Sequence, residues 1–244
     1  MPQIYKVGGC VRDRLLGLDS KDIDFTFVLD DLNQSVGEGF DEMTEYLQSE
    51  GYEIFLSTSE MFTIRAKFPV NHKFKGMVAD FVMARKEVGY TEGTRRPILK
   101  LGNLEDDLVR RDFTLNAMAE DIDGNLIDLF DGQWALENRL LITPRDASIT
   151  MLDDPLRLLR AFRFSITKGF TITPRIWETC LMDSVVDKLE KVVSGERIRE
   201  EVFKMFKHNT IETLDLIREI NYINPRIVEI MFGKGMWLKP TFEK

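Results

Sequence analysis

The hydrophobic pattern of the chain changes near residue 148, and this change limits the folds that the chain can adopt. Before it, strand-like segments rich in Ile, Val, Phe and Thr alternate with short helical patterns; these segments are residues 3–8, 22–29, 53–57, 62–68 and 78–84. After it, apolar residues recur every three to four positions in residues 153–169, 174–184, 195–208 and 210–221. The pattern therefore predicts an α/β or α+β part with a mixed sheet, followed by an all-helical part.

The composition restricts the environment in which the chain works. Of its 244 residues 43% are hydrophobic and 30% are charged, as is typical of a soluble globular protein. The sequence has no apolar run of the ~18–20 residues that span a membrane, and the N-terminal MPQIYKVGGC does not resemble a signal peptide. Cys10 and Cys180 are far apart in sequence, which favours free thiols in a reduced compartment. We expect a cytoplasmic location and no membrane partner.

The charge is unevenly distributed. The net charge of −8, from 33 basic and 41 acidic residues, argues against a nonspecific nucleic-acid binder. Basic residues nevertheless cluster at Arg95–Arg96, at Arg110–Arg111, and at Arg157, Arg160 and Arg163. The distribution therefore allows a basic groove, but only a local one.

Two acids interrupt the strand-like segment KDIDFTF, residues 21–27. Asp22 and Asp24 would share one face of a strand with their Cα atoms ~6.5–7 Å apart, a spacing that suits a pair of divalent ions ~3.5–4 Å apart. Asp80, in the apolar segment VADFVMA, would supply a third acid. Carboxylates suit Mg²⁺, whereas two histidines without a cysteine cluster do not suit zinc. Taken alone, however, so short a pattern is more typical of an edge strand whose acids face water.

A glycine turn precedes the acids. In VGGCVRDRLLG, Gly8 and Gly9 end a strand, so the backbone can approach a ligand closely, and the helix that follows offers free N–H groups to a phosphate. Arg12 would add a charge-assisted bond to the same anion, and Asp13 would orient Arg12. The alternative is an ordinary turn beside a solvated arginine.

These motifs, in this order, resemble the class II CCA-adding enzymes and bacterial poly(A) polymerases, which are nucleotidyltransferases of the DNA polymerase β superfamily. GGCVRDRLLG with DIDF resembles their first catalytic motif, EDDLVRRDFTLNAMA their Arg-Arg-Asp motif, and DGQWALENRLL the segment after it. DDPLRLLRAFRF resembles their nucleobase-reading Glu-Asp-x-x-Arg motif, and SGERIREEVFKMF their neck helix. The resemblance runs from about residue 4 to 210. It implies a nucleotidyltransferase head over residues 1–148, a nucleotide-reading neck over 149–210 and a short body-like segment over 211–244.

The resemblance also implies a role for each motif. Two Mg²⁺ ions would be held by Asp22 and Asp24, with Asp80 on the ion that activates the attacking hydroxyl. The triphosphate of CTP or ATP would be bound by Gly8, Gly9, Arg12 and Arg111. The ribose 2′-hydroxyl would donate to Asp112, which we expect near the start of a helix that opens at Arg110. Supporting roles would fall to Arg110, Asn116, Glu196 and Arg199.

The nucleobase motif has a physical reading of its own. On a single helix, Asp153, Arg157, Arg160 and Phe164 share one face, and the opposite half is apolar, with Leu158, Leu159 and Phe162. The acceptor of Asp154 beside the donor of Arg157 matches the base edges of cytosine and adenine. Uracil and guanine present the reverse order and would leave buried polar groups unpaired, at ~1–3 kcal/mol each. The alternative is an ordinary i,i+4 pair between Asp153 and Arg157, and both readings are compatible.

The sequence departs from the family in two places. Asp153 stands where the family has Glu, which is one methylene longer, while Asp154 and Arg157 match the motif. The resemblance gives Asp153 a supporting role toward Arg157. The chain leaves only residues 211–244 for the helical body and tail of the family, enough for a helix or two, in which we expect Trp237, Phe232 and Met236 to pack. Oligomerisation or an accessory protein would then have to replace the missing grip on tRNA.

Residues 85–107 are polar and are expected to form a long mobile loop. Enzymes that resemble this chain use a loop at residues 85–97 to switch from C to A addition, and its length here favours complete CCA addition. The function that the sequence favours is CCA addition at the tRNA 3′ end. The alternatives are poly(A) tailing, a minimal nucleotidyltransferase that acts on a protein or small molecule, and a non-catalytic RNA-binding relic.

Overall fold

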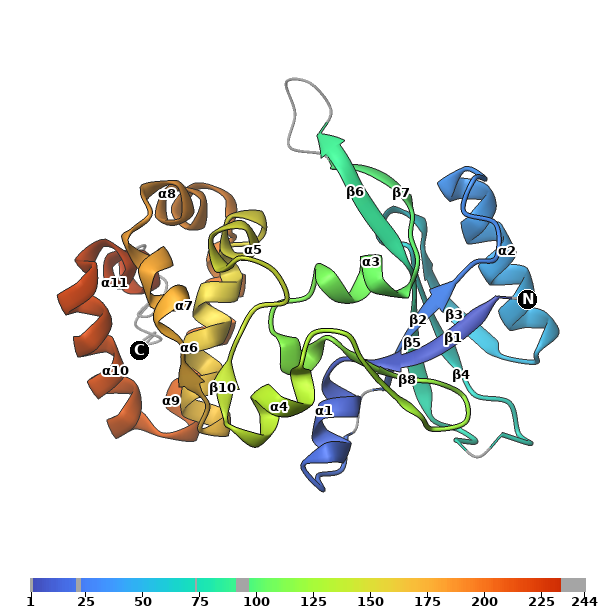
Figure 1. Cartoon of the computed structure of the whole chain (residues 1–244), viewed down its shortest axis with the longest axis horizontal. Coiled ribbons are helices and arrows are strands. Elements are labelled where there is room, and N and C mark those ends of the chain that lie inside the picture. The colour runs from blue at the N-terminus through green and yellow to red at the C-terminus, as the bar shows by residue number, and fades with distance from the viewer. Residues whose placement is uncertain (1, 21–22, 73, 91–96, 234–244) are drawn as a thin grey trace, which may run out of the picture. The chain divides into compact units, whose positions relative to one another are not determined.

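The computed structural model describes residues 2–20, 23–72, 74–90 and 97–233. The chain forms two compact units, Met1–Gln133 and Trp134–Lys244 (Figure 1). Among the described residues, no helix combines the length and the apolar character that a membrane crossing requires.

The first unit is built on a mixed seven-stranded sheet, as the sequence predicts. Its strands, in spatial order, are β3 (Glu53–Thr58), β4 (Thr63–Lys67), β5 (Val78–Met83), β2 (Ile23–Val28), β1 (Gln3–Val7), β8 (Met118–Glu120) and β9 (Leu126–Asp128). β2 and β5 pair in parallel, and every other neighbouring pair is antiparallel. Because the parallel pair lies inside the sheet, its residues have a strand on either side.

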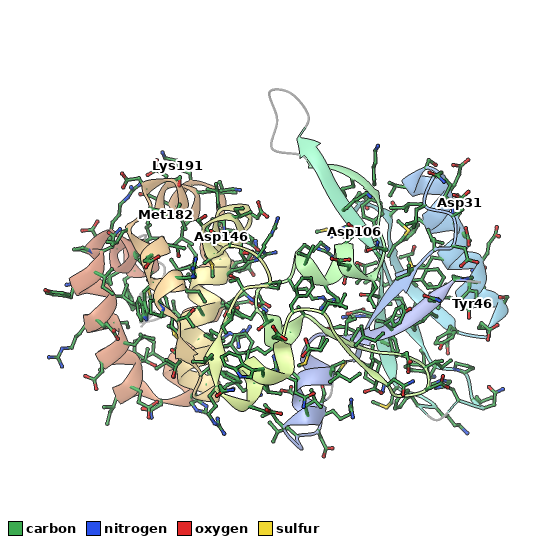
Figure 2. All side chains as sticks on the ribbon, viewed as in Figure 1. Asp31, Tyr46, Asp106, Asp146, Met182 and Lys191 are labelled. Atoms are coloured by element: carbon green, nitrogen blue, oxygen red, sulfur yellow. The ribbon has the colours of Figure 1, made fainter. Side chains whose placement is uncertain are left out.

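The two faces of this sheet differ in character. α2 (Val36–Ser49) covers one face, where Phe25, Phe27, Met43 and Leu47 belong to a single buried cluster (Figure 1). Tyr46 of α2, labelled in Figure 2, contacts Phe27, with the ring centroids 5.4 Å apart. Because side chains alternate along a strand, the residues between these phenylalanines point to the other face.

The second face carries α1 (Gly9–Leu15) and α3 (Leu104–Val109) (Figure 1). Its apolar cluster is smaller and includes Val7 of β1 and Leu108 of α3. Val7 lies opposite Asp24 in the β1–β2 register, so Asp24 belongs to this face. The sheet therefore has one apolar face under α2 and one face that bears the candidate catalytic groups.

The expectation of a long loop over residues 85–107 is wrong for the described residues. β6 (Arg85–Tyr90) and β7 (Pro97–Leu101) form an antiparallel hairpin that projects beyond the main sheet, and α3 follows it (Figure 1). Arg85 fixes the base of the hairpin by donating from Nη1 to the carbonyl of Met61, at 2.6 Å. The polar composition belongs to a hairpin that is separate from the main sheet, and only its last residue, Leu101, is known to join the buried cluster under α2. Residues 91–96 lie outside the described residues.

The second unit is almost wholly helical, as the sequence predicts. α4 (Gly132–Glu137) lies at the boundary, and the helices that follow are α5 (Ala147–Asp153), α6 (Leu156–Lys168), α7 (Pro174–Glu178), α8 (Asp183–Val192), α9 (Gly195–His208), α10 (Thr210–Ile223) and α11 (Pro225–Phe232). Asp146, labelled in Figure 2, caps α5 by accepting from the Ser148 amide at 2.8 Å. The expected apolar side of α6 is fully buried at Leu158, Leu159 and Phe162.

The chain divides into its two compact units between Gln133 and Trp134, and the predicted head, neck and body-like segment stay a prediction. A short parallel pair, β10 (Leu140–Leu141) with β11 (Thr171–Ile172), ties the segment before α5 to the helical unit. At the C-terminal end, α10 and α11 provide the expected two helices, and Phe232 packs against Phe206 with ring centroids 6.4 Å apart. Met236 and Trp237 lie outside the described residues.

Candidate active site

Two of the predicted acids lie side by side on the second face of the sheet. Asp24 of β2 is directly opposite Asp80 of β5 in the parallel register. Neighbouring strands are ~4.8 Å apart, so both carboxylates can reach the same ion. They line one pocket, together with Ile23, Arg65, Met77, Val78 and Ala79. Asp22, the remaining predicted acid, lies outside the described residues.

The donor set suits Mg²⁺. The carboxylates of Asp24 and Asp80 are hard oxygen donors, and a magnesium ion held by one or two carboxylates keeps coordination positions for water and phosphate. Among the described residues, which leave out Asp22, no group of three or more His, Cys, Asp or Glu side chains is arranged to hold a metal ion. The described part of the site thus provides two ligands from neighbouring strands.

An arginine that sequence reasoning missed contacts this pair. Arg65 of β4 lies opposite Asp80 in the antiparallel register. Its Nε donates to Asp80 Oδ1 and its Nη2 to Oδ2, both at 2.6 Å. Asp80, which has no partner near it in sequence, therefore has a bidentate partner across the sheet.

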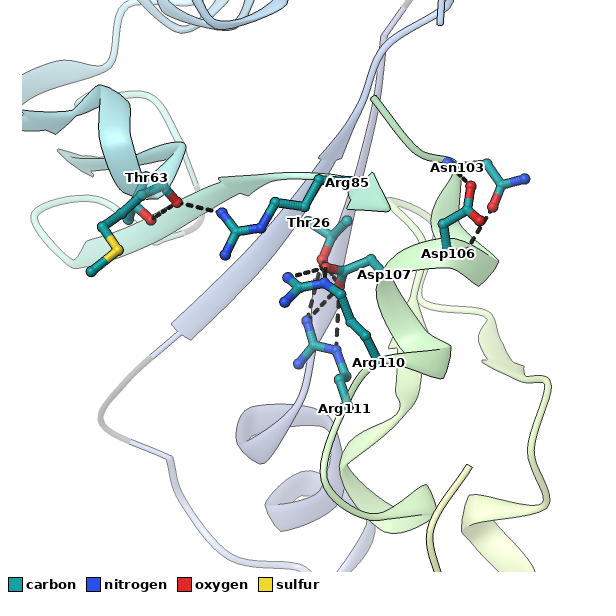
Figure 3. Close-up of polar contacts among 9 residues, drawn as sticks. Thr26, Thr63, Arg85, Asn103, Asp106, Asp107, Arg110 and Arg111 are labelled. Carbon is teal, nitrogen blue, oxygen red and sulfur yellow. Dashed lines mark hydrogen bonds and ion pairs between the residues drawn. The ribbon is translucent and has the colours of Figure 1, made fainter. Parts of the chain in front are cut away.

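A buried carboxylate organises the arginines of the Arg-Arg-Asp motif (Figure 3). Asp107 of α3 is fully buried; its Oδ1 accepts from Arg110 Nη2 at 2.6 Å, and its Oδ2 accepts from Arg111 Nη2 at 2.7 Å. Thr26 Oγ1 of β2 also donates to Oδ2, at 2.8 Å. Burial alone raises the pKa of the Asp107 carboxyl, but the charges of Arg111 and Arg110 outweigh it and hold that pKa well below its usual range. Asp107 is therefore ionised and links both arginines to the strand that carries Asp24.

The glycine turn lies beside one of these arginines. Gly8 has φ of 76°, a left-handed conformation that favours glycine, and α1 begins at the next residue. A Cβ atom at Gly8 would be 2.9 Å from Arg111 Nη1. The absence of a side chain at Gly8 thus lets the Arg111 guanidinium lie against the turn, where the sequence predicts a triphosphate site.

Arg12 is held by partners on both sides. The side chain is buried; its Nε donates to Asp13 Oδ1 at 2.9 Å, as expected, and its Nη1 donates to Asn116 Oδ1 at 2.5 Å. Asn116 in turn donates from Nδ2 to Asp112 Oδ1 at 2.9 Å. The predicted triphosphate residue Arg12 and the predicted ribose residue Asp112 therefore belong to one hydrogen-bonded chain, with Asn116 as the link.

The predicted helix start at Arg110 is wrong. Arg110 is the C-cap of α3, and Asp112 precedes a single 3₁₀ turn, Thr114–Asn116, before β8. The preceding segment EDDLV forms most of α3, because its three acids suit the first turn of a helix, and this helix ends at Arg110. Asp112 accepts from the Phe113 amide at 2.8 Å, so a local turn orients its carboxylate.

Cys10 lies next to Asp24 of the acid site. Its Sγ donates to the Val7 carbonyl at 3.2 Å. Burial raises the pKa of the Cys10 thiol, and the charge of Asp24 adds to this effect. The residue therefore stays a neutral thiol at neutral pH. Cys10 and Cys180 are both free, in agreement with the sequence-based expectation.

The nucleobase motif belongs to the second unit and is not one continuous helix. α5 ends at Asp153, and α6 begins after Pro155, because proline disfavours the helical conformation in the residue before it. Asp153 pairs with Arg145 instead of sharing a helical face with Arg157. The expected common face of Asp153 with Arg157, Arg160 and Phe164 is therefore wrong, and Phe164 is buried.

Asp154 and Arg157 nevertheless flank the same turn. The Arg157 amide donates to the Asp154 carbonyl at 3.0 Å, and Arg157 Nη1 donates to the Thr150 carbonyl at 3.2 Å. Asp154 Oδ2 accepts from Arg197 Nη2 of α9 at 3.1 Å. Arg160 lies over the Phe164 ring, 5.9 Å from its centroid. The structure thus brings Asp154 and Arg157 together and adds Arg197.

The two predicted supporting residues of α9 differ in environment. Glu196 is exposed in the first turn of the helix. Arg199 is half-buried, and its Nε is buried without a hydrogen-bond partner among the described residues.

The residues that the sequence did not predict differ in the signal that they leave in it. The i,i+3 and i,i+4 spacing of Asp107 to Arg110 and Arg111 is visible in EDDLVRR and is a usable signal. Arg65 and Arg197 give no such signal, because their partners are 15 and 43 residues away.

Gly8→Ala should weaken nucleotide binding more than it weakens the fold. The left-handed conformation costs an alanine about 1–2 kcal/mol, and the new Cβ would displace Arg111. Gly17→Ala is the matched control, because Gly17 has φ of 70° with nothing within 4 Å of an added Cβ. Titration with CTP should show a several-fold weaker Kd only for Gly8→Ala; equal affinities in both variants would exclude Arg111 from the site.

A mixed sheet with two acids in register, beside a glycine turn and an anchored arginine pair, is the arrangement expected of a nucleotidyltransferase head. The model of the poly A polymerase head domain matches residues 4–142. The chain therefore belongs to the class II CCA-adding enzyme and poly(A) polymerase head family of nucleotidyltransferases.

Individual relatives agree with this assignment. Over 209 residues the chain is 35% identical to the multifunctional CCA protein of Hahella chejuensis, covering 83% of this chain and 43% of that protein. Its fold is similar to a Bacillus stearothermophilus CCA-adding enzyme in complex with CTP, with a TM-score of 0.70, 27% identity, and 89% and 48% of the two chains covered. It is also similar to a tRNA nucleotidyltransferase complexed with a primer tRNA and an incoming ATP analog, with a TM-score of 0.67, 27% identity, and 94% and 59% covered. The chain spans about half the length of these relatives.

Proposed function

We propose that the chain is a template-independent RNA nucleotidyltransferase that adds or repairs the 3′-terminal CCA of tRNA from CTP and ATP, with release of pyrophosphate. The observation that carries the proposal is the register of Asp24 and Asp80 on neighbouring strands of a head that belongs to this family. The similarity to proteins solved with CTP, with tRNA and with an ATP analog supports the choice of substrates.

In the proposed reaction the 3′-hydroxyl of tRNA attacks the α-phosphorus of the bound nucleotide. The new bond joins the 3′ oxygen to the α-phosphorus, the bond from the α-phosphorus to the bridging oxygen breaks, pyrophosphate leaves, and the hydroxyl proton passes to solvent water. Asp24 and Asp80, with Asp22, would hold two Mg²⁺ ions, which stabilise the attacking and leaving oxygens when bound.

The arginines would hold the triphosphate. Arg12 and Arg111 carry fixed positive charge and fork-like donors that suit phosphate oxygens. Arg12 is oriented by Asp13 and Asn116, and Arg111 by Asp107, so little side-chain entropy is lost on binding. Asp112 would accept from the ribose 2′-hydroxyl and so favour ribonucleotides.

Base selection would fall to the second unit. Asp154 would supply an acceptor and Arg157 a donor at one turn. Asp153, which pairs with Arg145, and Arg160, which lies over the Phe164 ring, would have supporting roles. The Asp154 carboxylate already accepts a hydrogen bond from Arg197. When a base binds, Arg197 would either leave this carboxylate or hold it in the orientation that accepts from the base. This pair would accept cytosine and adenine and reject uracil and guanine, as the order of donors and acceptors requires.

The proposed partners are the tRNA 3′ end and nucleoside triphosphates, in the cytoplasm. Poly(A) tailing and transfer to a protein or small molecule are the alternatives.

A transfer assay with a panel of acceptors tests the proposal. The purified chain is incubated with Mg²⁺ and each α-labelled nucleotide singly, on tRNAs that end before the first C, after CC or after CCA. We expect CMP only on the first tRNA, AMP only on the second and no addition to the third. Long A tails on any RNA would support poly(A) tailing, label on the protein or on a small molecule would support the other alternative, and no transfer at all would contradict the proposal.

A further inference from the structure

The acid pair of the head has a cation built into the sheet beside it. Arg65, Asp80 and Asp24 occupy the same register position on β4, β5 and β2, so their side chains leave the same face in a row. All three line one pocket. The guanidinium is thus an immediate neighbour of the carboxylates that would bind divalent cations.

The contact between Arg65 and Asp80 uses the whole carboxylate. Both oxygens of Asp80 accept an N–H, each at 2.6 Å, in the fork geometry that only arginine offers. A divalent cation on either oxygen would lie close to the guanidinium, and the two positive charges would repel each other. Binding of a divalent cation at Asp80 therefore competes with Arg65.

The position of Arg65 beside Asp80 also compensates for the repulsion between the carboxylates of Asp80 and Asp24. Two carboxylates directly opposite each other on neighbouring strands repel, and like charges in that position destabilise a sheet. The side chain of Asp80 is only 26% exposed, so water screens the repulsion incompletely. The positive charge of Arg65 offsets the remaining repulsion between the two carboxylates.

We propose that Arg65 is the built-in counter-ion of the acid site: it stabilises the head by holding Asp80, and it lowers the affinity for divalent cations because its positive charge opposes theirs at the same carboxylate. This inference rests on the metal site of the proposed function. It assigns Arg65 a positioning role toward Asp80 and no part in the chemical step.

The test is metal binding without nucleotide. Mn²⁺ is titrated into the wild type, Arg65→Gln and Lys67→Gln, and free Mn²⁺ is measured by electron paramagnetic resonance. Lys67 is the matched control, since it lies on the same strand, is equally exposed (46% against 47%) and pairs with Glu53 rather than with Asp80. Loss of a charged, bidentate competitor should tighten binding about three- to tenfold in Arg65→Gln and leave Lys67→Gln unchanged.

Thermal unfolding supplies the second readout. In EDTA, Arg65→Gln should melt about 2–4 °C below the wild type, as expected for a change of about 1 kcal/mol in a domain of this size, and excess Mn²⁺ should remove the difference. Lys67→Gln should show the same small change with and without the metal. A loss in Arg65→Gln that is equal in both conditions would make the contact merely structural and overturn the proposal.

A third comparison separates this inference from the proposed function. In an Asp80→Asn background, Arg65→Gln should no longer change the affinity for Mn²⁺. If wild type and Arg65→Gln bind Mn²⁺ equally, the counter-ion role is wrong while the nucleotidyltransferase proposal stands. If neither binds Mn²⁺ in an Asp24-dependent way, the metal site fails and the inference fails with it.

Discussion

Asp24→Asn should reduce nucleotide transfer by about a thousandfold or more, while the protein stays folded. The substitution removes one of the two described carboxylates of the acid site, and metal ions contribute several kcal/mol to the stabilisation of charge in such transition states. Each 1.36 kcal/mol corresponds to about tenfold in rate. Single-turnover transfer of labelled CMP to a tRNA that lacks CCA measures the effect.

The stability of this variant is equally informative. Asp24 lies opposite Asp80, so loss of its charge relieves repulsion, and the melting temperature in EDTA should not fall. Glu53→Gln is the control, since it removes an exposed acid from the edge of the same sheet. A variant that keeps transfer within tenfold of the wild type would show that Asp24 is not a metal ligand.

Asp107→Asn should lower the free energy of unfolding by about 3 kcal/mol, the lower end of the range for breaking a buried ion pair. Asp107 is fully buried between two arginines and Thr26, and an asparagine amide would place N–H donors against those cations. The arginines are 26% and 21% exposed, so water compensates them in part. Urea unfolding at neutral pH measures the loss, which is large beside a typical total stability of about 5–15 kcal/mol.

The loss should depend on pH in a defined direction. The pKa of Asp107 is lowered in the folded state, so its contribution is fully present above the unfolded pKa of about 3.9 and is lost as the pH falls toward the folded value. The difference between wild type and Asp107→Asn should therefore be constant from about pH 5 to 8 and shrink below about pH 4. Glu105→Gln, an exposed acid of the same helix, should cost less than about 0.5 kcal/mol. An equal cost in both variants would contradict the role of Asp107.

Much of the head follows from local sequence patterns. The strands around Asp24 and Asp80 are visible because β-branched and aromatic residues alternate on their buried face, and the glycine turn is visible because only glycine suits the φ of Gly8. The helical second unit follows from the three-to-four spacing of residues such as Leu158 and Phe162.

The remainder depends on long-range contacts or on context. The register that sets Asp24 opposite Asp80 and Asp80 opposite Arg65 requires the order of strands, which no short window contains. The hairpin of β6 and β7 pairs outside the main sheet, so its polar residues give no core signal. The break at Pro155 was predictable from the residue type, but the motif that it interrupts reads as one amphipathic helix.

The sequence of the added 3′ ends is the most direct test of the proposal that this chain adds CCA to tRNA. The chain is incubated with Mg²⁺, all four nucleoside triphosphates at equal concentration and a tRNA that ends before the CCA, and the products are sequenced, with Asp24→Asn as the blank. We expect ends of C, CC and CCA, with no further growth and almost no U or G. Mixed bases, long A tails, or the same products from Asp24→Asn would contradict it.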